Sequence, residues 1–140
     1  MGHFITLLVA MGSAGFAAEA EPDFVKEIKP ILEARCIKCH GTTKMEGELD
    51  LSNKEGALLG GEYGPAIAGG SLEESILMQR IIKEKDDDEV MPSKGRLLTK
   101  KEIEKIRIWI EAGAPWPKEI TLEEAKEGKA SEGESAEGQK

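Results

Sequence analysis

The sequence predicts an all-α protein of about four helices. Four apolar segments have helical spacing, and each begins near a residue that can cap a helix. No segment shows the sustained alternation of polar and apolar residues that marks a half-buried strand. Connections rich in Gly and Pro separate the four segments, and no internal repeat is present.

The first predicted helix starts after Pro22, with Asp23 as its N-cap. Pro30 lies inside this segment and cannot donate a backbone hydrogen bond, so we expect a kink or a restart near Lys29. The apolar residues that form one helical stripe here are Phe24, Ile28, Ile31, Leu32 and Cys36.

Ser/Thr-x-x-Glu capping boxes predict the other three starts. Gly60-Gly61 is expected to end the second helix. Gly113, which is followed by Pro115, is expected to end the last helix. The long connections 60–70 and 85–98 are expected to have a functional role, because long ordered loops are uncommon in a small domain. The boxes are Ser52 with Glu55, Ser71 with Glu74 and Thr99 with Glu102, and the apolar segments after them are 57–59, 72–82 and 103–110.

The segment Cys36-Ile37-Lys38-Cys39-His40 has the C-x-x-C-H pattern at which a c-type haem is attached. Two cysteines at this spacing can bind the two vinyl groups of one porphyrin, and the adjacent imidazole can ligate the iron. These are the only two cysteines in the chain. Two alternatives remain: a zinc site, which usually needs four N or S ligands, and a redox dithiol, which usually lies in a βαβ context.

The two ends of the sequence differ from its middle. An apolar run over 4–18 followed by Ala18-Glu19-Ala20 predicts a signal peptide, residues 1–20, cleaved after Ala20. The run is shorter than the roughly 20 residues of a membrane span, so we expect no span in the mature chain. Residues 118–140 are rich in Glu, Lys, Gly and Ser and predict an acidic, disordered tail that buries no core, which leaves one domain over 22–117.

The chain is acidic, with 27 Asp and Glu against 19 Lys and Arg. Basic residues alternate with acidic ones and no Gly-rich phosphate loop is present, which argues against a nucleic-acid partner. The acidic run 86–89 has three interpretations: a solvated loop, a patch for a basic partner, or a charge that stabilises ferric iron.

His40 can occupy one axial position of a haem iron, and the mature chain offers no second histidine or third cysteine for the other. Methionine, lysine, water or an open site remain. Met45 is too close to His40 in sequence, and Met78 is expected to fill the core. Met91 precedes Pro92 in a loop, which favours an extended backbone and makes it the preferred ligand. Lys94 is the less favoured alternative.

Four segments together resemble the planctomycete-type cytochrome c domain, a branch of the monohaem class I cytochromes. The resemblance covers about residues 24–116. It departs from the family pattern at Met91-Pro92-Ser93, where Met-Pro-Pro is expected, and at residues 68–71, where the family often has Pro-Gly-Asp. The segments are CIKCHG, GALLGGEYGPAIAGG, SLEESILMQRI and VMPSKGRLLTKKEIEKIRIWIEAGAPW.

The resemblance implies a cytochrome c-like fold around one covalently bound haem c, with His40 and Met91 as axial ligands. It also implies that the carbonyl of Pro65 accepts a hydrogen bond from Nδ1 of His40, and that Trp109 lies on the haem side of the last helix. From the residues alone, Pro65 could equally be an ordinary loop proline, and Trp109 would belong to a plain core stripe.

These observations predict an exported, periplasmic electron-transfer protein rather than an enzyme, with redox proteins as its donor and acceptor. Two alternatives stay open. One is a haem enzyme or gas sensor with an open distal site, and the other is a cytochrome subunit of a larger dehydrogenase complex. The sequence does not indicate an oligomeric state.

Overall fold

The computed structural model describes residues 19–126. Within this range no strand forms, and β-structure is confined to isolated bridges, so the predicted all-α class is confirmed for the described residues. Most of the predicted signal peptide, residues 1–18, and the last part of the predicted tail, residues 127–140, lie outside the described part. The elements are η1 (Phe24–Ile28), α1 (Lys29–Arg35), η2 (Glu46–Glu48), α2 (Lys54–Leu59), α3 (Ile76–Ile81) and α4 (Lys100–Glu111).

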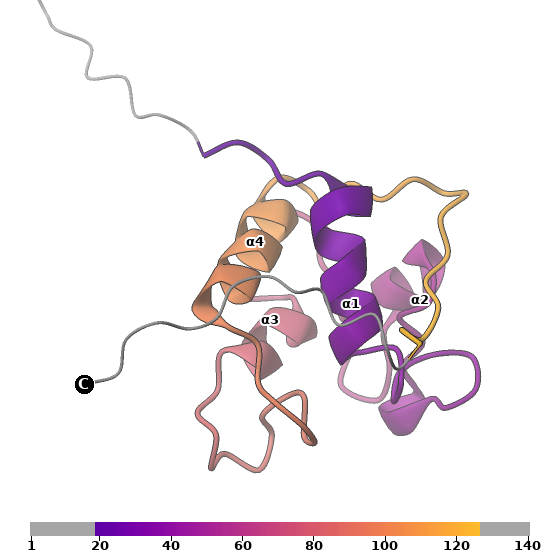
Figure 1. The fold of residues 1–140 in the computed structure, drawn as a ribbon, viewed down its shortest axis with the longest axis vertical. Helices are drawn as coiled ribbons and strands as arrows, with labels where there is room; N and C mark the ends of the chain where they lie inside the picture. The colour runs from indigo at the N-terminus through magenta and orange to yellow at the C-terminus, as the bar shows by residue number, and fades with distance from the viewer. Residues whose placement is uncertain (1–18, 127–140) are drawn as a thin grey trace, which may run out of the picture.

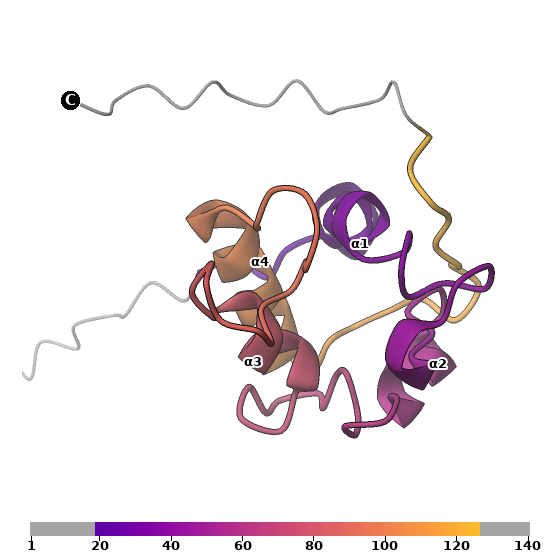
Figure 2. The same cartoon turned by 90° about the horizontal axis from the view of Figure 1, so that it is seen from below.

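The first and last helices pack together at one side of the molecule (Figure 1). Element η1 contacts α4, and α4 also contacts α3. Seen from below, α1, α4, α3 and α2 are arranged as a ring (Figure 2). None of the helices in residues 19–126 is long and apolar enough to cross a membrane.

The break predicted in the first helix is confirmed. Asp23 caps η1 through its side chain, which accepts a hydrogen bond from the amide of Lys26 at 2.8 Å. The π-helical turn η1 then ends at Ile28, and α1 begins at Lys29 with Pro30 in its first turn. Proline is tolerated there because the first amides of a helix have no intrahelical partner.

Helix α4 also begins and ends as predicted. The Thr99 hydroxyl accepts from the Glu102 amide at 3.1 Å, and the Glu102 carboxylate accepts from the Thr99 amide at 2.7 Å, so the capping box is complete. The helix ends at Glu111, and Gly113 follows with a φ of 97°. Glycine is suited to this position because other residues are strained at positive φ.

The starts of the two middle helices differ from the prediction. Helix α2 is capped by Asn53, whose side chain accepts from Gly56 at 2.8 Å, while Ser52 is buried. Helix α3 covers only 76–81. The Ser75 hydroxyl donates to the carbonyl of Ser71 at 2.7 Å and accepts from the amide of Ala68 at 2.9 Å, which holds the preceding residues in turns.

The core lies between η1, α1 and α4. Trp109, at the centre, has no exposed surface, and its ring lies 5.7 Å from that of Phe24 and 6.2 Å from that of Trp116, between centroids. Phe24 and Trp116 are 4.7 Å apart, so three aromatic rings from η1, α4 and the segment after α4 form one cluster.

The segment after Pro117 contributes to this core, contrary to the expectation that residues 118–140 bury none. Leu122 is 4% exposed, and its amide donates to the carbonyl of Ser52 at 2.7 Å. The indole of Trp116 donates to the carbonyl of Ile120 at 2.8 Å. Residues 112–126 thus cross from α4 to the side of α2 (Figure 1), which moves the end of the packed domain beyond the predicted residue 117.

Candidate functional site

A cavity of about 780 Å³ brings together four of the six side chains predicted for the site. These are Cys36, Cys39, His40 and Met91, and we call this space the main cavity. Its size is typical of a site for an organic cofactor. Apolar side chains form much of its wall, including Leu49, Leu51, Leu77, Ile81 and Leu98.

The C-x-x-C-H segment continues from the end of α1 as a series of turns. The amide of Cys36 donates to the Leu32 carbonyl at 2.8 Å, and the amide of His40 donates to the Cys36 carbonyl at 3.0 Å. These bonds direct both cysteines and the histidine to the wall of the main cavity. Three side chains from one five-residue segment therefore line one space.

Both cysteines are free thiols. Desolvation raises the pKa of Cys36 to about 12, although neighbouring Arg35 acts in the opposite direction. Redox-active cysteines have a lowered pKa, because the thiolate is the reactive form. The environment of Cys36 is thus the opposite of the one that a dithiol redox site requires.

The imidazole of His40 is oriented by the loop that follows it. Its Nδ1 atom lies 2.9 Å from the carbonyl oxygen of Glu46. The amide of Glu46 in turn donates to the Cys39 carbonyl at 2.9 Å, so residues 41–46 fold back onto the motif. A histidine whose Nδ1–H donates to a carbonyl keeps the lone pair of Nε2 for a metal.

Pro65 does not make the bond that the family resemblance implied. It is exposed and does not line the main cavity, although its neighbours Gly64 and Ala66 do. Its carbonyl accepts from the amide of Ile76 at 3.2 Å and so caps the start of α3. In this structure the carbonyl of Glu46, not that of Pro65, lies within hydrogen-bond distance of Nδ1 of His40.

Trp109 does not line the main cavity either. Its indole nitrogen donates to the carbonyl of Pro115 at 2.9 Å, and its ring lies within the aromatic cluster. In this structure Trp109 is therefore a core residue of the apolar stripe on α4. Leu98, just before α4, lines the cavity instead.

Met91 lines the main cavity from the loop between α3 and α4. Met78 is 7% exposed and lies in the core, as predicted, and Met45 is 51% exposed. Of the three methionines in residues 19–126, only Met91 borders this cavity. Lys94 also borders it, so both candidate ligands of this loop are near the motif.

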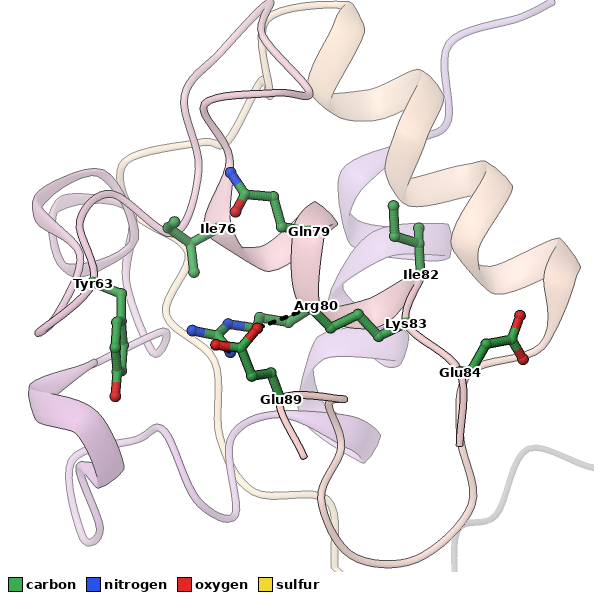
Figure 3. Close-up of a pocket in the computed structure, with 8 residues that line it drawn as sticks. All are labelled: Tyr63, Ile76, Gln79, Arg80, Ile82, Lys83, Glu84 and Glu89. Carbon is green, nitrogen blue, oxygen red and sulfur yellow. Dashed lines mark ion pairs between the residues drawn. The ribbon is translucent and has the colours of Figure 1, made fainter. Parts of the chain in front are cut away.

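A second hollow of about 620 Å³, whose lining residues are drawn in Figure 3, adjoins the main cavity, and we call it the outer hollow. Four residues border both spaces: Tyr63, Ile76, Arg80 and Glu89. Arg80 and Glu89 form an ion pair with 3.0 Å between Nη1 and Oε1. No sequence motif predicts this group of residues, because Glu89 meets Arg80 only through the folding of the loop after α3.

The donor set fits a c-type haem: two free thiols, an imidazole with one nitrogen hydrogen-bonded, and a thioether around a largely apolar space. This donor set within an all-helical domain is compatible with a c-type cytochrome.

Comparison with protein families agrees with this class. Residues 36–95 match the family model of planctomycete cytochrome C, so this segment is similar to that family. The match begins at Cys36 and includes His40 and Met91, and it is narrower than the resemblance noted over 24–116. The family indicates haem binding and a role in electron transfer. No curated protein and no solved structure matched the chain.

Proposed function

We propose that this protein is an exported monohaem c-type cytochrome that transfers single electrons between redox proteins. One haem c would be attached through Cys36 and Cys39 and ligated by His40 and Met91. The observation that carries the proposal is the placement of these four side chains around one largely apolar cavity. When bound, the haem supplies a reversible one-electron couple at iron.

The residues around the cavity suit such a carrier. A methionine sulfur is a weak donor that favours ferrous iron, and apolar walls favour the same state. The hydrogen bond from His40 to Glu46 acts in the opposite direction, because it makes the imidazole a stronger donor. The reduction potential would thus be set by opposing contributions of Met91 and His40.

The first experiments test haem attachment in the mature protein, produced in a host that attaches c-type haem. A haem stain that survives denaturing electrophoresis would support covalent attachment, and it should be lost in Cys39→Ser. Metal analysis showing zinc and no haem would overturn the proposal in favour of the zinc alternative.

The same sample distinguishes a carrier from an enzyme or sensor. The ferric protein should show the weak far-red band of a methionine–iron bond, and the ferrous protein should not respond to carbon monoxide. Haem without that band, and a Soret shift with carbon monoxide, would favour the open-site alternative. Copurification with a dehydrogenase would favour the subunit alternative.

Export is tested separately. We propose cleavage after Ala20, so N-terminal sequencing of protein recovered from the periplasm should begin at Glu21. A mature protein that retains residues 4–18 would contradict a cleaved signal peptide.

A further inference from the structure

Arg80 is a largely buried cation on the rim of the main cavity. It lies in the last turn of α3, and its side chain is only 16% exposed. Its guanidinium carbon lies 4.9 Å from the centre of the Tyr63 ring, so the guanidinium stacks against an aromatic face (Figure 3). This contact holds the guanidinium in the wall between the main cavity and the outer hollow.

The carboxylate that pairs with Arg80 is shared. Glu89 contacts Arg80 through Oε1 at 3.0 Å and Lys83 through Oε2 at 2.8 Å, and its side chain is 54% exposed. A guanidinium carries five N–H donors in a planar fork that can bind a carboxylate through two of them. The ion pair with Glu89 uses one nitrogen of Arg80, Nη1, so Arg80 retains capacity for a second carboxylate.

We propose that Arg80, stacked on Tyr63, forms a carboxylate subsite that binds a propionate group of the haem. This inference rests on the proposed function. A haem combines an apolar ring with two propionate carboxylates, and the main cavity combines apolar walls with this enclosed cation at its rim. A mostly buried charge is stabilised when a carboxylate completes its hydrogen bonds.

Other cations border the main cavity, and Arg35 is the strongest competitor, because its buried Nε has no hydrogen-bond partner. Arg35 directly precedes Cys36, one of the two proposed thioether positions. The vinyl and propionate groups occupy opposite sides of a haem, so a residue beside Cys36 is less suited to the propionates than Arg80. Arg80 also has the aromatic support that fixes its orientation.

The test compares Arg80→Gln with Lys83→Gln in the haem-loaded protein. Both substitutions remove one cation paired with Glu89, but Lys83 borders only the outer hollow. The readout is the propionate bending band of the resonance Raman spectrum, which reports hydrogen bonding to the propionates. We expect this band to shift in Arg80→Gln and to stay at the wild-type position in Lys83→Gln. The reduction potential should fall further in Arg80→Gln, because a cation that offsets the propionate charge is lost.

An unshifted band in Arg80→Gln would overturn the subsite, as would equal shifts in both variants. If Arg80→Gln yields no folded protein, Arg80→Lys tests the same proposal. It retains the charge but loses the fork, so the band should still shift, and a wild-type band there would refute the proposal. Failure of the wild type to attach haem would refute the proposed function itself, which is a distinguishable result.

Discussion

The amide nitrogen of Met91 lies 3.2 Å from the carbonyl oxygen of Arg80. This bond closes the loop 82–90 at its base and ties the proposed ligand to the last turn of α3. The ion pair of Arg80 with Glu89 reinforces the same closure from the side chains, and Val90 is 8% exposed beside them. The backbone at Met91 is thus held in place beside the cavity by the protein itself.

Replacing Met91 with Ala should remove the sixth iron ligand while the covalent haem is retained. The potential should fall, because a ligand that favours ferrous iron is lost. The ferric far-red band should disappear, and the ferrous form should bind carbon monoxide. Optical spectra and voltammetry measure these changes.

Met45→Ala is the matched control for that experiment. Met45 is half exposed and does not border the main cavity, so its variant should retain the band and the potential. A band that survives in Met91→Ala would exclude Met91 as the ligand and direct attention to Lys94.

Gly47→Ala should weaken the hydrogen bond between His40 and Glu46. Gly47 has a φ of 63°, and an alanine there is strained by about 1 kcal/mol, although a Cβ would meet no atom within 4 Å. Relaxing the strain displaces the adjacent Glu46 carbonyl. We expect faster solvent exchange of the His40 Nδ1 proton, measured by NMR of the reduced protein, and a higher potential, because the imidazole becomes a weaker donor.

Gly70→Ala carries a similar backbone penalty away from the site, with a φ of 82° and no atom within 4 Å of the added Cβ. It should lower stability without changing Nδ1 proton exchange or the potential. Equal exchange rates in the two variants would show that the Glu46 carbonyl does not orient His40.

Local signals in the sequence predicted the parts of the fold that depend on neighbouring residues. The break before Lys29 follows from Pro30, and the start of α4 follows from Thr99 and Glu102, because each feature is decided within one helical turn. The C-x-x-C-H motif and the loop position of Met91 likewise selected residues that the structure places at one cavity.

Features that depend on distant packing were predicted poorly. A periodic stripe shows that Trp109 is buried but not whether it faces a cavity or the aromatic cluster. Pro65 could not be chosen or excluded from the sequence, because the partner of His40 depends on how loop 41–46 folds, and in this structure that partner is the Glu46 carbonyl. Leu122 was assigned to a tail because Ile120 and Leu122, the two large apolar residues of a polar segment, are too few to show periodicity. Its backbone bond to Ser52, a residue far away in sequence, carries no local signal.

The stability of the protein should depend on pH through Glu102. Two hydrogen bonds from Arg96, each 2.8 Å, lower the pKa of Glu102 from its ordinary 4.5 to about 2, with help from the Thr99 amide. A folded pKa below the unfolded one means that the ionised carboxylate stabilises the fold. This stabilisation is present above about pH 4.5 and is lost as the pH falls towards 2.

Glu102→Gln should therefore destabilise the protein near neutral pH by about 1–2 kcal/mol, a value reduced for the partial exposure of the pair. The difference from wild type should shrink when urea unfolding is repeated near pH 3. Glu104→Gln is the control, because its pair with Arg107 is on the exposed face of the same helix and is screened by solvent. A difference for Glu102→Gln that is constant with pH would show that its charge does not contribute.

Leu122→Ala should destabilise the protein although it lies outside the expected domain. The side chain is 4% exposed and packs in the core, so truncation removes buried surface and leaves a cavity, at a cost of about 2–4 kcal/mol. Leu59→Ala is the matched control, because Leu59 is 83% exposed, and its loss should change stability by less than about 0.5 kcal/mol. Urea unfolding of both variants gives the comparison. Equal stabilities would mean that residues 118–126 do not pack on the domain in solution, and a large loss in Leu122→Ala alone would establish this segment as part of the folded unit.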